Sequence, residues 1–287
     1  MKKLILCLAV ALLAFSCTKN QGQLVPVSVQ VDAFEISQGE IRGMKAIPID
    51  DYSGIKNVTL AFYNADGTEQ YKTTQLKNDS NTYTTFGEFS LNLPMGSYTM
   101  VVIGYSTLDD SPFTLTNSTS ASYTGDHALE TFVATQAVSI TNTNAVTLSA
   151  TLDRIVSKLQ IISTDGKTVN ASNVRMTLTG GSRSFNPTTG LATDNNGFNN
   201  TVGISAALGA TSTSTTYLFL ATDEETTMDI TIDVLDSDGT SISHKFVQNV
   251  PFLRNRVTKL TGALYSAGIG TNFQVNTTWL PDYDGGF

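Results

Sequence analysis

Residues 25–36 read VPVSVQVDAFEI, and this stretch decides which class of fold the chain forms. Val25, Val27, Val29 and Val31 alternate with the polar residues Ser28, Gln30 and Asp32. Successive side chains of a β-strand point to opposite faces, so a two-residue period places all four valines on one face. We therefore predict a half-buried β-strand over residues 25–36.

Other apolar runs support an all-β fold. Three of them, at residues 55–63, 155–162 and 228–235, precede the pairs Asp66-Gly67, Asp165-Gly166 and Asp238-Gly239. Glycine tolerates the positive φ that a tight turn requires, so each pair predicts a hairpin between antiparallel strands, in meanders and Greek keys. Further strands are predicted at residues 86–93, 96–105, 138–152, 174–178, 217–221, 254–264 and 273–279.

Composition points to the same class. Charged residues make up only 15% of the chain, and long stretches with the 3.6-residue period of a helix are missing. The net charge of −8 comes from 25 acidic and 17 basic residues, without a dense cluster of Lys and Arg. A row of phosphates would have no matching positive surface, which argues against nucleic acid as a partner.

The first seventeen residues predict export from the cytoplasm. Lys2 and Lys3 precede an apolar run over residues 4–15, which is shorter than the roughly 20 residues that span a bilayer. A small residue then stands before Cys17, as in a bacterial lipoprotein signal, which predicts cleavage after residue 16 and lipidation of Cys17. The alternative is an ordinary secretory signal in which Cys17 has no role.

We predict two domains beyond this leader, since the remaining chain is longer than a typical domain of about 100–150 residues. Residues 17–24 form a polar spacer. The apolar pattern restarts near Ala150, and we divide the chain there into an N-terminal domain at 25–150 and a C-terminal domain at 151–287. Cys7 and Cys17 both lie in the leader region, so no internal disulfide is predicted.

The sequence carries no strong signature of catalysis. His127 and His244 are the only histidines, and neither has His or Cys at metal-ligand spacing, so we predict no metal site and no cofactor. A Ser-His-Asp triad would need one of these two residues. Asp233, Asp236 and Asp238 lack the spacing of a calcium loop, and a hairpin turn is the favoured interpretation. We predict that the protein is not an enzyme, and a secreted hydrolase is the least favoured alternative.

The layout resembles the Bacteroidetes fimbrillin superfamily, which contains the subunits and anchors of type V pili. The resemblance covers nearly the whole chain after the leader, and residues 152–159 and 254–264, with the motif RNRVTKLTGAL, are the most characteristic parts. It implies two tandem transthyretin-like β-sandwich domains. It also implies export to the outer membrane as a lipoprotein, removal of the first strand by a trypsin-like protease, and filling of the vacated groove by a strand of a neighbouring subunit.

Three segments match these roles. Residues 25–36 are the candidate removable strand, and Arg42, in an expected exposed loop at 37–53, is the candidate cleavage point; the alternative is a solvated loop arginine. The candidate donor strand carries Phe273, Val275, Thr277 and Trp279 on one face, although it could instead close the sheet of its own domain.

The predicted function is a structural, adhesive fimbrial subunit at the cell surface. Its predicted partners are other fimbrial subunits, a processing protease and the outer membrane through the lipid on Cys17. The alternative function is a surface lipoprotein that binds glycans by stacking sugar rings on Tyr52, Tyr123 and Tyr283, which we predict to be aromatic residues of loops.

Overall fold

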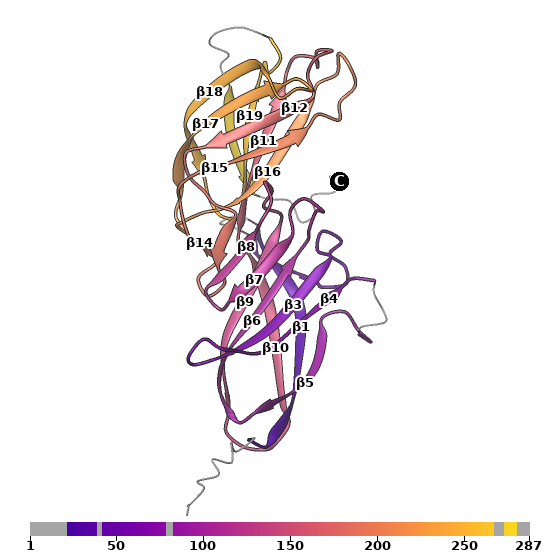
Figure 1. Ribbon diagram of the computed structural model, residues 1–287, viewed down its shortest axis with the longest axis vertical. Helices are drawn as coiled ribbons and strands as arrows, with labels where there is room; N and C mark the ends of the chain where they lie inside the picture. Colours follow the sequence, from indigo (N-terminus) through magenta and orange to yellow (C-terminus); the bar gives the residue numbers. More distant parts are fainter. Residues whose placement is uncertain (1–21, 39–41, 79–82, 267–272, 280–287) are drawn as a thin grey trace, which may run out of the picture.

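The computed structural model describes residues 22–38, 42–78, 83–266 and 273–279, and all of its regular structure is β. Within these ranges no helix has the length and apolar character needed to span a bilayer. Figure 1 shows an elongated molecule with the strands of the N-terminal half at one end and those of the C-terminal half at the other. The predicted all-β class is confirmed.

One eight-stranded sheet forms most of the N-terminal half. Its strands run in the order β2-β1-β10-β9-β6-β3-β4, and β5 pairs with β1 beside this path. The sheet curls around a single apolar core that extends from Val25 to Leu152. Its strands are β1 (Leu24–Gln38), β2 (Arg42–Pro48), β3 (Asn57–Asn64), β4 (Glu69–Leu76), β5 (Glu88–Pro94), β6 (Gly96–Tyr105), β9 (Thr131–Ile140) and β10 (Val146–Arg154).

The C-terminal half is a sandwich of two four-stranded sheets over a second core, which includes Leu159, Ile230 and Leu260. The first sheet has the order β16-β11-β19-β20 and the second the order β15-β12-β17-β18. Their strands are β11 (Val156–Ser163), β12 (Asn173–Leu178), β15 (Phe198–Gly203), β16 (Thr213–Phe219), β17 (Thr226–Leu235), β18 (Ser241–Phe252), β19 (Arg256–Gly262) and β20 (Gln274–Trp279).

A small fourth sheet connects the two halves. It takes β7 (Phe113–Asn117) and β8 (Ser120–Tyr123) from one half and β13 (Ser184–Asn186) and β14 (Leu191–Ala192) from the other. A third apolar cluster lies beneath it and contains residues of both halves, among them Tyr123 and Phe219. The predicted division between residues 150 and 151 stays a prediction, because this sheet crosses it.

The predicted first strand is confirmed as β1, with one irregularity. Val25, Val27, Val29 and Val31 are buried, whereas the residues between them are exposed. The pairing with β10 shifts at a bulge between Val31 and Ala33. The bulge changes the phase of the alternation, so that Phe34 and Ile36 also face the core.

Two of the three predicted Asp-Gly hairpins are confirmed, and the third is wrong. Gly67 and Gly239 have positive φ in the turns of the β3–β4 and β17–β18 hairpins. After Asp165-Gly166 the chain instead crosses to the other sheet, because β11 pairs with β16 and β19 and not with β12. Asp165 serves as an acceptor for the backbone amides of Leu264, Tyr265 and Ser266.

Three more predictions about the strands are wrong. The predicted loop at 37–53 contains β2, which pairs with the second half of β1 despite Gly43 and Pro48. The predicted strand at 138–152 is two strands, β9 and β10, separated by a bend at residues 141–145. The predicted antiparallel sheets contain two parallel pairs, β1–β10 and β11–β19, because each pair joins segments far apart in the chain.

Candidate functional site

The candidate site is the groove that holds β1. One edge of β1 bonds in parallel to β10, from Val27 opposite Val146 to Glu35 opposite Asp153. The other edge bonds antiparallel to β5 along residues 24–30 and to β2 along residues 33–38. Backbone hydrogen bonds therefore hold β1 on both sides over most of its length.

Neither β5 nor β2 pairs with any other described strand. β5 is also held to β4 by the side chain of Gln75, whose amide donates to the carbonyl of Glu88 at 2.7 Å and whose carbonyl accepts from the amide of Gly87 at 2.7 Å. Without β1, the sheet would be divided between β5 and β10 along a row of unpaired backbone groups.

The inward face of β1 supplies much of the N-terminal core. Six of its apolar side chains are at most 2% exposed. At about 1.5–3 kcal/mol for each buried side chain, together they contribute roughly 9–18 kcal/mol. This is comparable to the whole free energy of unfolding of an ordinary domain, about 5–15 kcal/mol. They are Val25, Val27, Val29, Val31, Phe34 and Ile36.

The end of β1 fits its groove closely. The ring of Phe34 lies 5.4 Å from that of Tyr52 and 4.7 Å from that of Phe132. Gly104 of β6 makes room for it, since a Cβ at this position would lie 2.6 Å from Cε1 of Phe34. This end of the groove therefore accepts the ring of Phe34 only because β6 has a glycine, with no side chain, at position 104.

A buried polar cluster lies next to this ring, where the two halves meet. The Arg154 guanidinium is fully buried, and its Nε lies 2.9 Å from Oε1 of Glu130. It also donates to Oδ1 of Asn255 and to the hydroxyl of Tyr52, each at 3.0 Å. Burial raises the pKa of the Tyr52 hydroxyl. The cluster thus connects the segment after β2 with the C-terminal half.

Two carboxyl groups face each other on β1 and β10. Glu35 and Asp153 are opposite each other in the parallel register and share a hydrogen bond. Burial, followed by the charge of Asp153, raises the pKa of Glu35. Burial also raises the pKa of Asp153, although Arg254 opposes this. When both are ionised, their repulsion weakens the contact between these strands.

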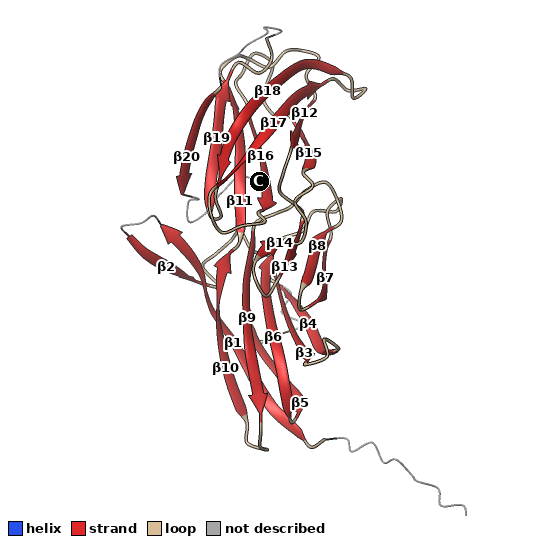
Figure 2. Cartoon of the chain, turned by 90° about the vertical axis from the view of Figure 1, so that its left-hand side faces the viewer, coloured by secondary structure: helices blue, strands red, loops and turns tan. Residues whose placement is uncertain are grey.

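The structure places the predicted site residues as follows. Arg42 is the first residue of β2, opposite Gln38, and not a loop residue. Figure 2 shows β2 projecting from the side of the molecule, near the junction of the two halves. Cys17 lies outside the described residues, so its lipidation stays a prediction.

The candidate donor segment pairs with its own chain as β20. Trp279 lies opposite Arg256, and Thr277 lies opposite Thr258 on β19. Phe273 packs partly against the C-terminal core, but Val275 is 43% exposed. β20 is the last described strand of its sheet and pairs with β19 alone.

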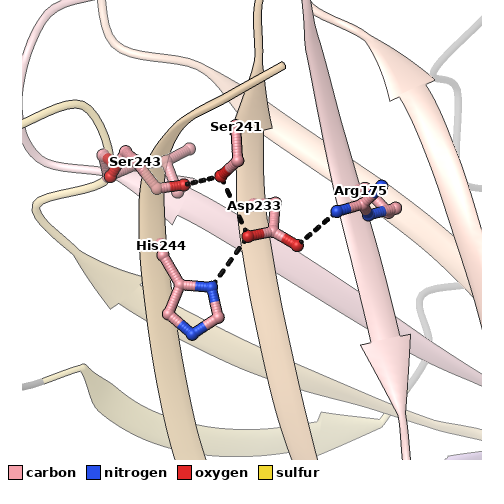
Figure 3. A network of polar contacts seen from close by, with 6 residues as sticks. Arg175, Asp233, Ser241, Ser243 and His244 are labelled. Carbon is pink, nitrogen blue, oxygen red and sulfur yellow. Dashed lines mark hydrogen bonds and ion pairs between the residues drawn. The ribbon is translucent and has the colours of Figure 1, made fainter. Parts of the chain in front are cut away.

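Figure 3 shows a polar network around Asp233 on the C-terminal sandwich. Asp233 accepts hydrogen bonds from Arg175 at 2.8 Å and from Ser241 at 3.1 Å, and it contacts Nδ1 of His244 at 2.8 Å. Ser243 donates to the carbonyl of Leu264. The hydroxyls of Ser241 and Ser243 bond to Asp233 and to the carbonyl of Leu264 and not to the imidazole of His244, so these residues do not form the arrangement of a Ser-His-Asp triad.

The acidic turn beside this network is a hairpin turn, as predicted. Asp236 Oδ1 accepts from the amides of Asp238 and Thr240. Among the described residues, no group of three or more His, Cys, Asp or Glu side chains could hold a metal ion. His127 lies elsewhere, 3.8 Å from Asp110. The network around Asp233 serves to connect β12, β17 and β18.

The aromatic residues expected to stack sugar rings do not form such a surface. Tyr52 and Tyr123 are 2% and 3% exposed and belong to the cores. Tyr52 packs on Phe132 and bonds to Arg154, and Tyr123 bonds to Thr131. That expectation is wrong for both, because each phenol finds a buried partner. Tyr283 lies outside the described residues.

Sequence reasoning missed the cluster around Arg154 altogether. Its one signal was a charged residue at an inward-facing position of an apolar run, between Leu152 and Val156. A buried arginine needs several partners, and these come from residues 52, 130 and 255. Such distant partners cannot be paired from one sequence.

Comparison with known proteins gives a family for this arrangement. A model described as a family of unknown function, DUF6562, matches residues 25–286. The chain belongs to this family. No curated protein matches the DUF6562 chain.

Solved structures with the DUF6562 fold include two from Bacteroidetes. A "putative adhesin" from Bacteroides ovatus matches with a TM-score of 0.51 and 11% identity, over 93% of this chain and 99% of that chain. The fimbrial anchor protein Mfa2 from Porphyromonas gingivalis matches with a TM-score of 0.51 and 11% identity, over 90% of this chain and all of that chain. At such identities the likeness establishes a common fold, which agrees with the predicted resemblance to fimbrillins.

Proposed function

We propose that this protein is a structural, adhesive subunit of a surface fimbria, exported as a lipoprotein through Cys17 and joined to other subunits by strand exchange. The observation that carries the proposal is the position of β1, which fills an apolar groove between β5 and β10. An adhesin-like role is also supported by the nature of the proteins that share this fold.

Cleavage after Arg42 would separate β1 from the body at its junction with β2. β2 would stay attached through residues 43–48 but would lose its strand partner. The hairpin projects from the molecule, which is the geometry that proteases prefer. A cut at this point therefore frees β1 without breaking the chain inside the core.

Loss of β1 has to be coupled to its replacement. The six buried side chains of β1 contribute a free energy about as large as the whole free energy of unfolding of an ordinary domain. A subunit with an empty groove would be unstable, so a second strand fills the groove as β1 leaves. Such β-augmentation uses the backbone edges for affinity and the apolar face for register.

The groove also specifies the direction of the incoming strand. β1 runs parallel to β10 and antiparallel to β5. A replacement strand that restores both sets of hydrogen bonds has to run in the same direction as β1. A strand of opposite polarity would change the hydrogen-bond pattern on both edges at once.

β20 of another subunit is our proposed donor. Its residues at positions 273, 275, 277 and 279 repeat the spacing of the four valines of β1. β20 has one strand partner among the described residues, β19, and its Val275 is 43% exposed. Its detachment from an end position would break the pairing along one edge only, whereas β1 is paired along both edges.

Limited digestion of the full chain with a trypsin-like protease tests the cleavage step. We expect N-terminal sequencing to give a product that begins at Gly43, and the Arg42→Ala variant to yield none. The Lys45→Ala variant, changed three residues further along β2, serves as the matched control and is cut normally. An intact chain, or a cut only at other sites, rejects processing at Arg42.

A second measurement tests the exchange itself. Digested protein should form a ladder of multimers in denaturing gels without heating, and the undigested Arg42→Ala variant should not. Truncation after Ser266 should abolish the ladder while leaving the cut after Arg42 unchanged. If the truncated protein still forms the ladder, β20 is not the donor.

A further inference from the structure

The outer end of the C-terminal sandwich carries the two most exposed large apolar side chains among the described residues. Val169, in the loop after β11, is 79% exposed, and Leu208, in the loop between β15 and β16, is 70% exposed. β11 starts at the junction of the two halves and runs away from it, so both loops lie at the far end of the sandwich (Figure 1). We call the loops at 164–172 and 204–212 the tip.

Backbone hydrogen bonds hold the two loops of the tip together. The amide of Gly209 donates to the carbonyl of Lys167 at 2.9 Å, and the amide of Lys167 donates to the carbonyl of Ala210 at 2.8 Å. Gly166 permits this approach, since a Cβ at its position would collide with the carbonyl oxygen of Gly209. The two exposed apolar side chains are therefore carried by loops that support each other.

The segment that precedes β20 is anchored at the same end. The carboxylate of Asp165 accepts hydrogen bonds from the amides of Leu264, Tyr265 and Ser266. The side chain of Leu264 is fully buried, and the ammonium group of Lys245 donates to the carbonyl of Ser266 at 2.7 Å. None of these contacts involves β20, so a detached β20 would stay attached to the tip through Ser266.

The direction of the strands determines where the tip lies when β20 is donated. β20 starts at the tip, since Gln274 lies opposite Thr261 near the end of β19. A strand that replaces β1 has to enter the groove at the place where β1 starts, beside Pro94. This place is the end of the N-terminal half that points away from the sandwich, because β1 runs from there toward the junction.

The chain between the anchor and the donated strand is short. Residues 267–272 separate Ser266 from Phe273, and a fully extended chain of this length reaches only about 25 Å. If Phe273 takes the place of Val25, the tip of the donor has to lie within this distance of the acceptor's far end. Strand exchange therefore brings these two surfaces together.

The surface that the tip would meet is formed by two neighbouring connections. They are the β5–β6 turn at 94–97 and the β9–β10 bend at 141–145, which lie side by side because Gly96 pairs with Ile140. We call them the N-terminal pole, and Figure 2 shows it at the lower end of the molecule. Met95 is 45% exposed there, and neither connection contains a charged residue.

The charges of the tip do not oppose such a contact. Its two loops contain only two charged residues, Asp165 and Lys167. Asp165 is bound by three amides, and the ammonium group of Lys167 donates to the carbonyl of Ile204 at 3.0 Å. The tip and the uncharged pole can therefore meet without repulsion and without burying an unpaired charge.

We propose that the tip of one copy packs against the N-terminal pole of the next copy, with Val169 and Leu208 covering Met95. This inference rests on the proposed strand exchange and adds a second contact to each joint. The tip and the pole are different surfaces at opposite ends of an elongated molecule. Such a heterologous contact repeats from copy to copy and lines the copies up end to end.

The test is a time course of multimer formation, followed in denaturing gels without heating. The full chain is digested with an arginine-specific protease, which does not cut at introduced lysines. The double variant Val169→Asp with Leu208→Asp should form the ladder at least about tenfold more slowly than the parent, because the contact would bury carboxylates. Met95→Asp should slow it similarly. Leu76→Asp, an exposed apolar residue of β4 outside both surfaces, is the matched control and should keep the rate of the parent.

A rescue by opposite charges tests direct contact. Leu208→Lys alone and Met95→Asp alone should each slow the ladder. Both substitutions in one chain should restore at least about half of the parent's rate, because the lysine of one copy then meets the aspartate of the next. A variant that is slow only because its fold is damaged would not recover in this way.

Each contrary result overturns the proposal. Normal rates in the variants of the tip or of Met95, or no recovery in the charge pair, reject this contact and leave strand exchange standing. Slowing by the tip variants alone would mean that the tip meets another surface, which also rejects it. If the double tip variant does not fold, Met95→Asp decides. A parent that forms no ladder rejects strand exchange itself, and this inference with it.

Discussion

Gly104 of β6 lies against the ring of Phe34 of β1, so close that a Cβ on the glycine would come within 2.6 Å of Cε1 of Phe34. The two residues are seventy positions apart in the sequence. The contact shows how the body of the N-terminal half is shaped to receive one particular side chain of the strand proposed to leave.

The Gly104→Ala variant should therefore loosen β1 specifically. We expect the free energy of unfolding to fall by about 1–3 kcal/mol in urea denaturation, because the added methyl group overpacks the core. The double variant Gly104→Ala with Phe34→Leu should recover part of this loss. Gly203→Ala is the control, since its Cβ meets nothing closer than 3.9 Å. Equal stability of Gly104→Ala and the parent would show that Phe34 moves aside freely.

The cluster around Arg154 should stabilise the junction of the two halves. Arg154→Met leaves Glu130 without its ion-pair partner, and we expect a loss of about 3–5 kcal/mol in denaturation. Adding Glu130→Gln to Arg154→Met should restore part of the lost stability, because this second substitution removes the buried carboxylate that has no ion-pair partner. A double-mutant cycle measures this coupling, and strictly additive losses would mean that the pair does not act as a unit.

The pair Glu35 and Asp153 should make the N-terminal half less stable as pH rises. Burial raises the pKa of both carboxyl groups above their ordinary values of 4.5 and 3.8, so the folded protein binds more protons than the unfolded chain just above those values. Stability contributed by the protonated pair is present at low pH and lost as pH rises through the raised pKa values.

Glu35→Gln should flatten this dependence, measured by urea denaturation between about pH 4 and 7. Ser28→Asn, a neutral change on the exposed face of β1, should keep the slope of the parent. An identical slope in Glu35→Gln would show that the two carboxyl groups do not interact.

Asp165 should give the opposite dependence on pH. Burial opposes its ionisation, but hydrogen bonds from the amides of Leu264, Ser266 and Tyr265 outweigh burial and lower its pKa below 3.8. The stability that it contributes is present above 3.8 and lost as pH falls through the lowered value. Asp165→Asn should lower Tm at pH 6 and remove this part of the acid transition. A variant that loses as much stability between about pH 4 and 2 as the parent would contradict this role.

Several features of this fold could be predicted from local sequence alone. The alternation in residues 25–36 predicted β1 and its buried face, since a strand exposes every second side chain whatever its partners are. The turns at Asp66-Gly67 and Asp238-Gly239 were equally local, because positive φ at a glycine needs no distant contact. Composition was sufficient for the all-β class.

Other features depended on partners that lie far away in the chain. Residues 42–48 are a strand because the second half of β1 offers them an edge. Asp165-Gly166 is no hairpin, and the Asp165 carboxylate instead accepts from the amides of the distant residues 264–266. A backbone edge accepts any strand of suitable length, so only the folded chain determines which edges meet. The Arg154 cluster likewise joins residues that no local pattern relates. Local periodicity thus determined that the chain forms strands, and only the tertiary structure decided which strands pair and where a second subunit could bind.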